Sequence, residues 1–127
     1  MRMSLENAKL WILVVGLTLA SGFLDSRGFI YSANIWKFGS PALSETLKTF
    51  GAFVAGISLY CIALKYLGRL GVRAPEIQAI IWFGVTMIGI SVSSRRFLRW
   101  VATDQVIAIF VLVGIGWLVF RTSELPK

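Results

Sequence analysis

The chain has 127 residues, of which 57% are hydrophobic and only 15% are charged. Soluble domains contain about 45–50% apolar residues, so this composition excludes an ordinary soluble domain and predicts a membrane protein. The formal net charge is +7, and the basic residues gather at the ends of apolar runs. Anionic lipid headgroups therefore explain the charge more simply than nucleic acid does.

Residue usage also excludes several kinds of chemistry. Histidine is absent and Cys61 is the only cysteine. An intrachain disulfide is therefore impossible, and one chain cannot assemble the usual nitrogen and sulfur ligand sets of zinc or haem. The Ser and Thr residues have no His partner, so no nucleophile–base pair is visible. We expect no enzyme activity, no cofactor and no metal site.

The first apolar run extends from Leu10 to Leu24, and at about 15 residues it is too short to cross a bilayer alone. We therefore predict a helix over residues 10–31, which places Asp25 inside or near the membrane. A charge at mid-bilayer costs about 2.5–3.5 kcal/mol, so such an acid is a candidate functional residue. Arg27 points to another side of the helix and does not neutralise it. The alternative is that Asp25 lies at the far interface, in water.

Two patterns define faces of this first helix. Thr18, Ser21 and Asp25 are three and four residues apart and share one side. Gly16 and Ala20 form a small-xxx-small pair, which predicts that another helix approaches closely there.

A loop is expected over residues 28–41, followed by a second helix over residues 43–67. Ala52, Gly56 and Tyr60 recur every four residues, so the small side chains allow a close neighbour on the face that carries Tyr60. Tyr60 is either a packing residue whose hydroxyl finds a backbone partner or part of a binding site.

The third helix is predicted over residues 75–94, and its uncharged part of about 18 residues matches the hydrocarbon thickness of a bilayer. Polar and small residues recur along it at steps of three or four and form one stripe, which consists of Gln78, Trp82, Thr86, Gly89 and Ser93. Polar groups in lipid must find partners, so this stripe faces protein or a water-filled cavity. It is either a packing face or a substrate-facing one. Trp82 favours the cavity because it lies at mid-depth, outside the interfacial belt where Trp is usual.

The fourth helix is predicted over residues 100–120. It is polar at Asp104 and Gln105 and then apolar on all sides. Such a helix faces lipid or forms an oligomer contact and does not form a site. The four helices together predict one all-α domain over residues 1–127.

The basic residues give a small bias in orientation. With four helices, one side of the membrane holds seven of them: Arg2, Lys9, Lys65, Arg69, Arg73, Arg121 and Lys127. The other side holds Lys37, Lys48, Arg95, Arg96 and Arg99, with Arg27 deeper. This small excess favours cytoplasmic chain ends, and the near balance would also permit an antiparallel dimer.

Two short motifs carry a resemblance to a known family: ALKYLG at Ala63–Gly68, and PEIQAIIWFGVTMIGIS at Pro75–Ser91. They resemble the small multidrug resistance family of the drug/metabolite transporter superfamily, in which the second helix often ends in ALKY and the third carries an A-x-W-x-G run like that around Trp82 and Gly84. The resemblance covers most of the chain. It implies a four-transmembrane-helix bundle in a bacterial-type inner (plasma) membrane, working as an antiparallel homodimer or as paired small subunits.

The resemblance also implies a function. Family members use a first-helix glutamate for proton-coupled export of cations, and relatives in the superfamily flip lipid-linked sugars. By depth, that glutamate corresponds to Ser21, and Asp25 lies one turn further along the same face. The loop between the second and third helices is about four residues longer than the usual one in the family.

We therefore expect a small transporter or flippase subunit that moves a small cationic or lipid-linked substrate through the cavity of a dimer. The dimer would form with a second copy or with a similar small membrane protein. The expected substrate-binding residues are Ser21, Asp25, Tyr60, Gln78 and Trp82. Asp25 would titrate and pair with a cation or proton, and the two rings would hold a cation or stack on a sugar. The alternative is a non-transporting accessory subunit of a larger membrane complex, in which the same stripes are assembly faces.

Overall fold

A computed structural model describes residues 4–123 of the chain. The described residues form four α-helices and one short 3₁₀ helix, and no strand occurs among them. The elements are α1 (Leu5–Ser32), α2 (Leu43–Arg69), α3 (Pro75–Ser94), η1 (Phe97–Arg99) and α4 (Ala102–Ser123). This confirms the predicted all-α fold with four apolar helices.

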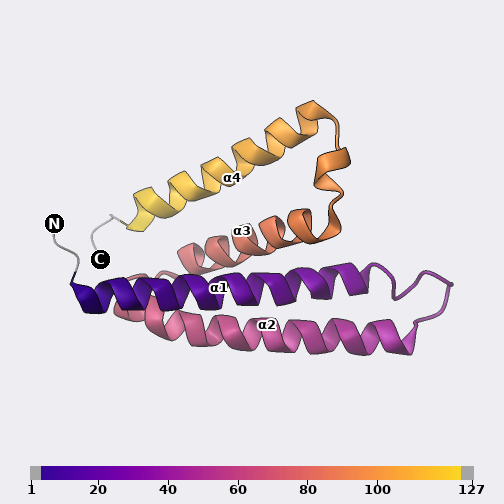
Figure 1. Ribbon diagram of the computed structural model, residues 1–127, viewed down its shortest axis with the longest axis horizontal. Helices are drawn as coiled ribbons and strands as arrows, with labels where there is room; N and C mark the ends of the chain where they lie inside the picture. Colours follow the sequence, from indigo (N-terminus) through magenta and orange to yellow (C-terminus); the bar gives the residue numbers. More distant parts are fainter. Residues whose placement is uncertain (1–3, 124–127) are drawn as a thin grey trace.

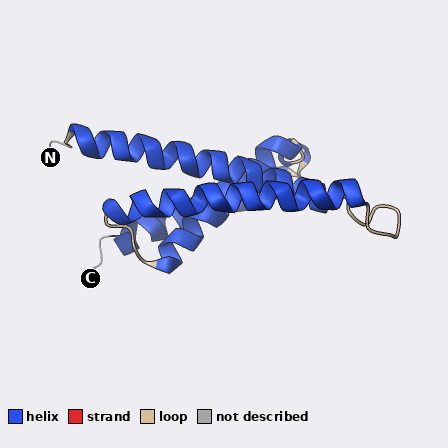
Figure 2. Cartoon of the chain, turned by 90° about the horizontal axis from the view of Figure 1, so that it is seen from below, coloured by secondary structure: helices blue, strands red, loops and turns tan. Residues whose placement is uncertain are grey.

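The helices pack in the pairs α1–α2, α1–α3 and α3–α4 (Figures 1 and 2). α1 and α2 form an antiparallel pair, α3 packs against α1 and runs in the same direction, and α4 returns along α3. The beginning of α1, the end of α4 and the α2–α3 connection therefore lie at one end of the molecule (Figure 1). The α1–α2 loop and η1 lie at the other end.

The helices have the length and composition of membrane spans. α1, α2 and α3 are each long and apolar enough to cross a bilayer, and Ala102–Leu118 of α4 forms a shorter apolar stretch. Their outward surface is also apolar, since Phe110 is 72% exposed and Trp117 is 61% exposed. Large apolar groups on such a surface are in contact with lipid. The chain is an integral membrane protein.

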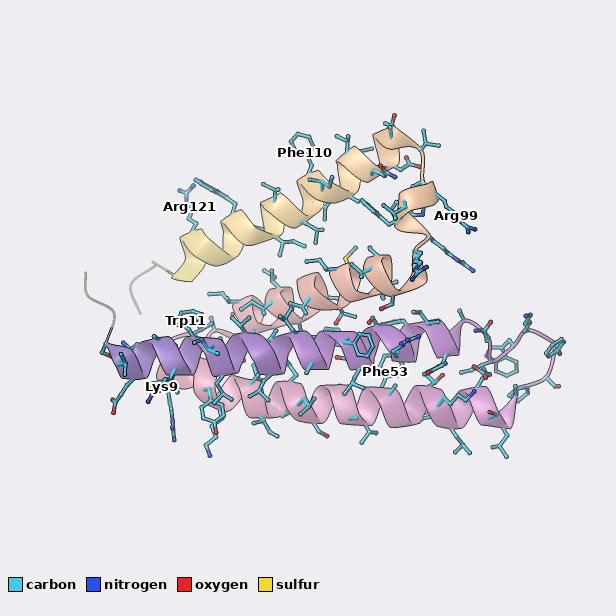
Figure 3. The ribbon with its side chains drawn as sticks, viewed as in Figure 1. Lys9, Trp11, Phe53, Arg99, Phe110 and Arg121 are labelled. Atoms are coloured by element: carbon cyan, nitrogen blue, oxygen red, sulfur yellow. The ribbon has the colours of Figure 1, made fainter. Side chains whose placement is uncertain are left out.

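Basic side chains lie at both ends of the helices, as the sequence predicts. Lys9 and Arg121 lie at the end that holds the beginning of α1, and Arg99 lies at the opposite end (Figure 3). Arg2 and Lys127, which were also assigned to the first of these ends, lie outside the described residues.

The helix bounds differ from the predicted ones mainly at α1 and α4. α3 begins and ends at the predicted residues, whereas α1 begins at Leu5, five residues before the predicted start. α1 ends at Ser32, one residue after the predicted end, so a loop beginning at residue 28 is wrong. α1 continues because its last turns pack on α2: Gly28 is buried against Phe53, and the rings of Phe29 and Phe53 meet edge to face at 5.0 Å. α4 begins two residues later than expected because η1 occupies the connection.

Glycines bring α1 into close contact with α3. An added Cβ at Gly22 would collide with the Val85 side chain and lie 3.2 Å from the Val85 carbonyl carbon and oxygen. An added Cβ at Gly89 would lie 2.8 Å from the Ser26 hydroxyl oxygen. Close backbone approach at small residues is the main way in which helices pack in membranes.

The predicted contact at Gly16 and Ala20 is wrong. An added Cβ at Gly16 would meet nothing within 4 Å, and Ala20 is exposed. Gly16 is six residues from Gly22, which is about 240° around the helix, so the two glycines lie on different sides. The side that packs is the one that also carries the polar residues.

The polar faces of α1 and α3 turn inward. Thr18, Ser21 and Asp25 are all buried, at 6%, 0% and 0% exposure. On α3, Thr86 is 2% exposed and Gly89 packs against α1. The prediction that these stripes face protein is confirmed for these residues.

The glycine contact can be tested by a matched pair of substitutions in one helix. We expect Gly22→Ala to lower the free energy of unfolding by about 1–3 kcal/mol, because the new methyl group has no room beside the Val85 backbone. Gly16→Ala should leave stability unchanged or slightly raise it, because Ala favours the helix and nothing obstructs it. Thermal unfolding in detergent micelles measures both, and equal effects would contradict the proposed α1–α3 contact.

Candidate functional site

Asp25 lies in α1 where α2 and α3 both come near, and its side chain is fully buried, with 0% exposure. Gly56 of α2 lies on one side of the carboxyl group, and Trp82 of α3 lies on the other. The alternative that Asp25 is solvated at the membrane interface is therefore wrong. Arg27 is exposed and points elsewhere, as expected from its spacing.

One carboxylate oxygen of Asp25 accepts a hydrogen bond from a side chain of another helix. Its Oδ2 accepts a hydrogen bond of 2.7 Å from the indole Nε1–H of Trp82. The Ser21 hydroxyl lies 3.4 Å from the same oxygen, but it also lies 2.7 Å from the carbonyl oxygen of Gly56. A serine hydroxyl has one hydrogen to donate, and the shorter contact is the better hydrogen bond. Trp82 is therefore the principal donor to Asp25.

The other carboxylate oxygen has no partner. Asp25 Oδ1 is buried without a hydrogen bond and faces Gly56, where an added Cβ would lie 2.7 Å from the carboxyl carbon. Glycine at this position leaves room for the carboxyl group. A buried polar atom without a partner is rare in proteins and calls for an explanation, such as a proton, an ion or a water molecule.

No basic side chain within the described part of the chain forms an ion pair with Asp25. Among residues 4–123 the only ion pair joins Lys48 to Glu45, near the start of α2. In the same part of the chain, no group of three His, Cys, Asp or Glu side chains could hold a metal ion. A single carboxylate carries one negative charge, which a proton or one monovalent cation can neutralise.

Tyr60 and Gln78 form a second polar group, nearer to the α2–α3 connection. The Tyr60 hydroxyl donates to the backbone carbonyl of Gln78, and the Gln78 side-chain amide donates to the carbonyl oxygen of Val72 at 3.2 Å. Tyr60 is 8% exposed and Gln78 is partly buried. In this structure, these two side chains fasten α2 and the connecting loop to α3.

The five residues predicted as a site thus divide into two hydrogen-bonded groups. Ser21, Asp25 and Trp82 form one, and Tyr60 and Gln78 form the other. The groups are joined through α3, because Gln78 and Trp82 are one helical turn apart and face the same side.

Sequence reasoning missed three polar side chains beside this site. Ser26 is fully buried and donates to the carbonyl oxygen of Phe23, while the hydroxyl oxygens of Thr18 and Thr86 are buried without a partner. Thr18 and Thr86 lay on the predicted polar faces but were not assigned to the site. Ser26 could have been found from the sequence because it lies four residues after Gly22. The two small residues form a small-xxx-small pair, which indicates close helix packing.

The bond between Trp82 and Asp25 can be measured by a double-mutant cycle. We expect Trp82→Phe to reduce the free energy of unfolding by about 1.5–3 kcal/mol, because it removes the one good donor to a buried charged acceptor. In an Asp25→Asn background the same substitution should cost clearly less, since the charged acceptor is gone. Additive effects of the two substitutions on chemical unfolding would show that the side chains do not interact.

No protein family, curated protein or solved structure matches this chain. The likeness of its second and third helices to the small multidrug resistance family therefore stays a prediction. The function must be derived from the buried carboxyl group and its surroundings.

Proposed function

We propose that this chain is a small membrane transporter or flippase subunit that moves a small cationic or lipid-linked substrate, with Asp25 as its ionisable group. The observation that carries the proposal is the burial of this acid among three apolar helices with one oxygen unpartnered. A charged group in this position is costly, so it is retained where it binds or exchanges a charge.

The surroundings of Asp25 suit an exchange between two positive partners. The unpartnered Oδ1 can carry a proton, or it can face an organic cation once the proton has left. Trp82 holds the other oxygen in place, and its ring and that of Tyr60 offer aromatic faces to a cation or a sugar. Proton and substrate would then compete for one carboxyl group, which is the basis of coupled exchange.

Access to the carboxyl group requires movement of the helices. Asp25 and Ser21 have no exposed surface in the described arrangement, so this arrangement corresponds to a closed state of the proposed cycle. Separation of α2 from α1 at Gly56 would uncover Oδ1 first, because that oxygen faces Gly56. We place the protein in a plasma membrane as a dimer, in line with its resemblance to small multidrug transporters.

The charge exchange at Asp25 predicts a specific pH dependence. Tetraphenylphosphonium, used as the cationic probe, should bind the purified chain more tightly as the pH is raised, because loss of the proton frees the carboxylate. Asp25→Asn should remove this dependence while the chain remains folded. Isothermal titration calorimetry in detergent measures the affinity, and circular dichroism measures the fold.

Asp104→Asn provides the matched control, because Asp104 is an exposed acid in the first turn of α4. It should bind the probe with the same pH dependence as the unsubstituted chain. An Asp25→Asn chain that still bound the cation with unchanged pH dependence would contradict the role of Asp25.

A non-transporting accessory subunit is the second candidate, and the apolar surface of α4 would be its assembly face. α4 packs on α3, and most of its described side chains are exposed, including Val106, Phe110 and Val113 at 50%, 72% and 64%. A helix with so much apolar surface can face lipid or another membrane protein. In a transporter dimer it would contact the second copy, and in a larger complex it would contact a different subunit.

The number of chains in the particle separates these two candidates. A fluorescent protein fused to the chain gives each copy one fluorophore. The transporter proposal predicts that single particles in nanodiscs bleach in two steps. Bleaching in one step, together with recovery of a larger complex after mild extraction from cells, would instead support the accessory subunit.

A further inference from the structure

A basic cavity of about 560 Å³ lies between the ends of α1 and α3, away from Asp25. Its polar lining consists of Arg27, Asn34, Ser93, Ser94, Arg96 and the indole-bearing Trp100. No acidic side chain lines it. The two guanidinium groups, the hydroxyls and the amide are the donors that bind a phosphate group.

The charges of this cavity are available to a ligand. Neither Arg27 nor Arg96 forms an ion pair with another described residue. The Arg27 guanidinium lies over the ring of Phe23, at 5.4 Å from its centroid, and both arginines are exposed. α1 ends five residues after Arg27 and α3 ends at Ser94, so the cavity lies at the ends of the spans, where lipid headgroups are found.

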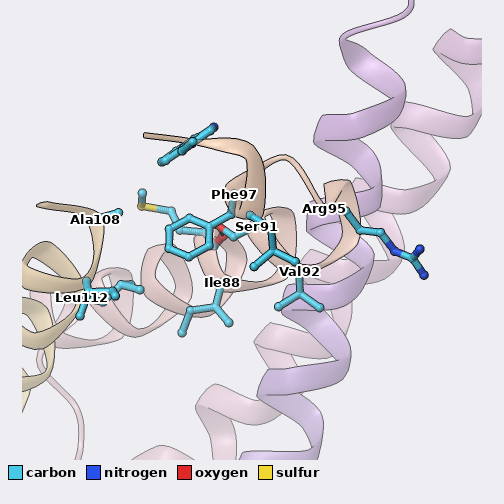
Figure 4. A pocket seen from close by; sticks show the side chains of 11 residues that line it. Ile88, Ser91, Val92, Arg95, Phe97, Ala108 and Leu112 are labelled. Atoms are coloured by element: carbon cyan, nitrogen blue, oxygen red, sulfur yellow. Dashed lines mark hydrogen bonds between the residues drawn. The ribbon is translucent and has the colours of Figure 1, made fainter. Parts of the chain in front are cut away.

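An apolar groove adjoins the basic cavity. It measures about 600 Å³, lies between α3 and α4, and is lined mainly by apolar side chains such as Ile88, Ala108 and Leu112 (Figure 4). Trp100 lines both the groove and the basic cavity. A polar pocket and an apolar groove thus meet at one side chain.

A smaller hollow links the same surfaces on the α1 side. It measures about 230 Å³ and shares Ile88 and Val92 with the groove and Ser93 with the basic cavity. Phe23, which lies under the Arg27 guanidinium, is part of its lining. The apolar surface is therefore continuous from α1 over α3 to α4, beside the two arginines.

We infer that these hollows form a binding site for a lipid with an anionic phosphate headgroup. Arg27 and Arg96 hold the phosphate, Ser93 and Asn34 supply further hydrogen bonds, and the chain of the lipid lies in the α3–α4 groove. Free phosphate would use only the basic cavity, whereas the adjoining groove fits an apolar tail. The site is separate from Asp25, so lipid binding holds whether or not the chain transports a substrate.

Binding of phosphatidic acid to the full chain in detergent, measured by native mass spectrometry, tests this site. We expect the tightest site to bind one lipid per chain. The double substitution Arg27→Gln and Arg96→Gln should weaken the affinity of this site about tenfold or more. Arg99→Gln is the control, because it removes one positive charge at the same end of the molecule and Arg99 does not line the cavity. It should change the affinity less than about twofold.

The substitution Ala108→Trp tests the groove separately, because the larger side chain fills the space between α3 and α4 and leaves every arginine in place. It should weaken phosphatidic acid binding about fivefold or more, because the acyl chain can no longer be buried in the groove. Inorganic phosphate at millimolar concentration should not displace the lipid, and phosphatidylcholine should bind more weakly. Equal loss with Arg99→Gln, no loss with Ala108→Trp, or displacement by inorganic phosphate would each overturn the proposed site.

Discussion

The carboxyl group of Asp25 is fully buried, so it depends on the helices around it for hydrogen-bond partners. The indole of Trp82 supplies the main one and thereby ties the second half of α1 to α3. The Ser21 hydroxyl lies beside the same carboxyl oxygen and ties α1 to the Gly56 carbonyl of α2. Polar contacts that link three helices thus meet at one ionisable group, and Tyr60 adds a separate link between α2 and α3.

Small residues make these polar contacts possible. The indole can reach Asp25 only because α1 and α3 pack closely at Gly22 and Gly89, and the carboxyl group fits beside α2 only because Gly56 lacks a side chain. In lipid, where apolar surfaces alone do not drive helices together, close packing and hydrogen bonds act jointly. Among its described residues α4 has neither an ionisable nor a hydrogen-bonding stripe in the membrane, and it packs mainly on α3, leaving an apolar groove between them.

Sequence patterns predicted the helices and their polar faces but not the pairing of individual side chains. The polar stripes on α1 and α3 were found because lipid penalises unpartnered polar groups, and this penalty leaves a clear periodicity. The choice of contact glycine was wrong, since Gly16 and Gly22 look alike in sequence and only the position of α3 distinguishes them. Likewise, the division of the five predicted site residues into two groups depends on where Gln78 finds an acceptor, and that acceptor is a loop carbonyl.

The hydrogen bond between Trp82 and Asp25 can be observed directly by nuclear magnetic resonance. The chain contains five tryptophans, so ¹⁵N labelling of their indoles gives few and separable signals. If the account is right, the Trp82 indole N–H signal, assigned with Trp82→Phe, exchanges slowly with solvent and shifts in an Asp25→Asn chain, while the other indole signals stay in place. A Trp82 indole that exchanges as fast as the others, and does not respond to Asp25→Asn, would contradict a buried carboxyl group held by Trp82.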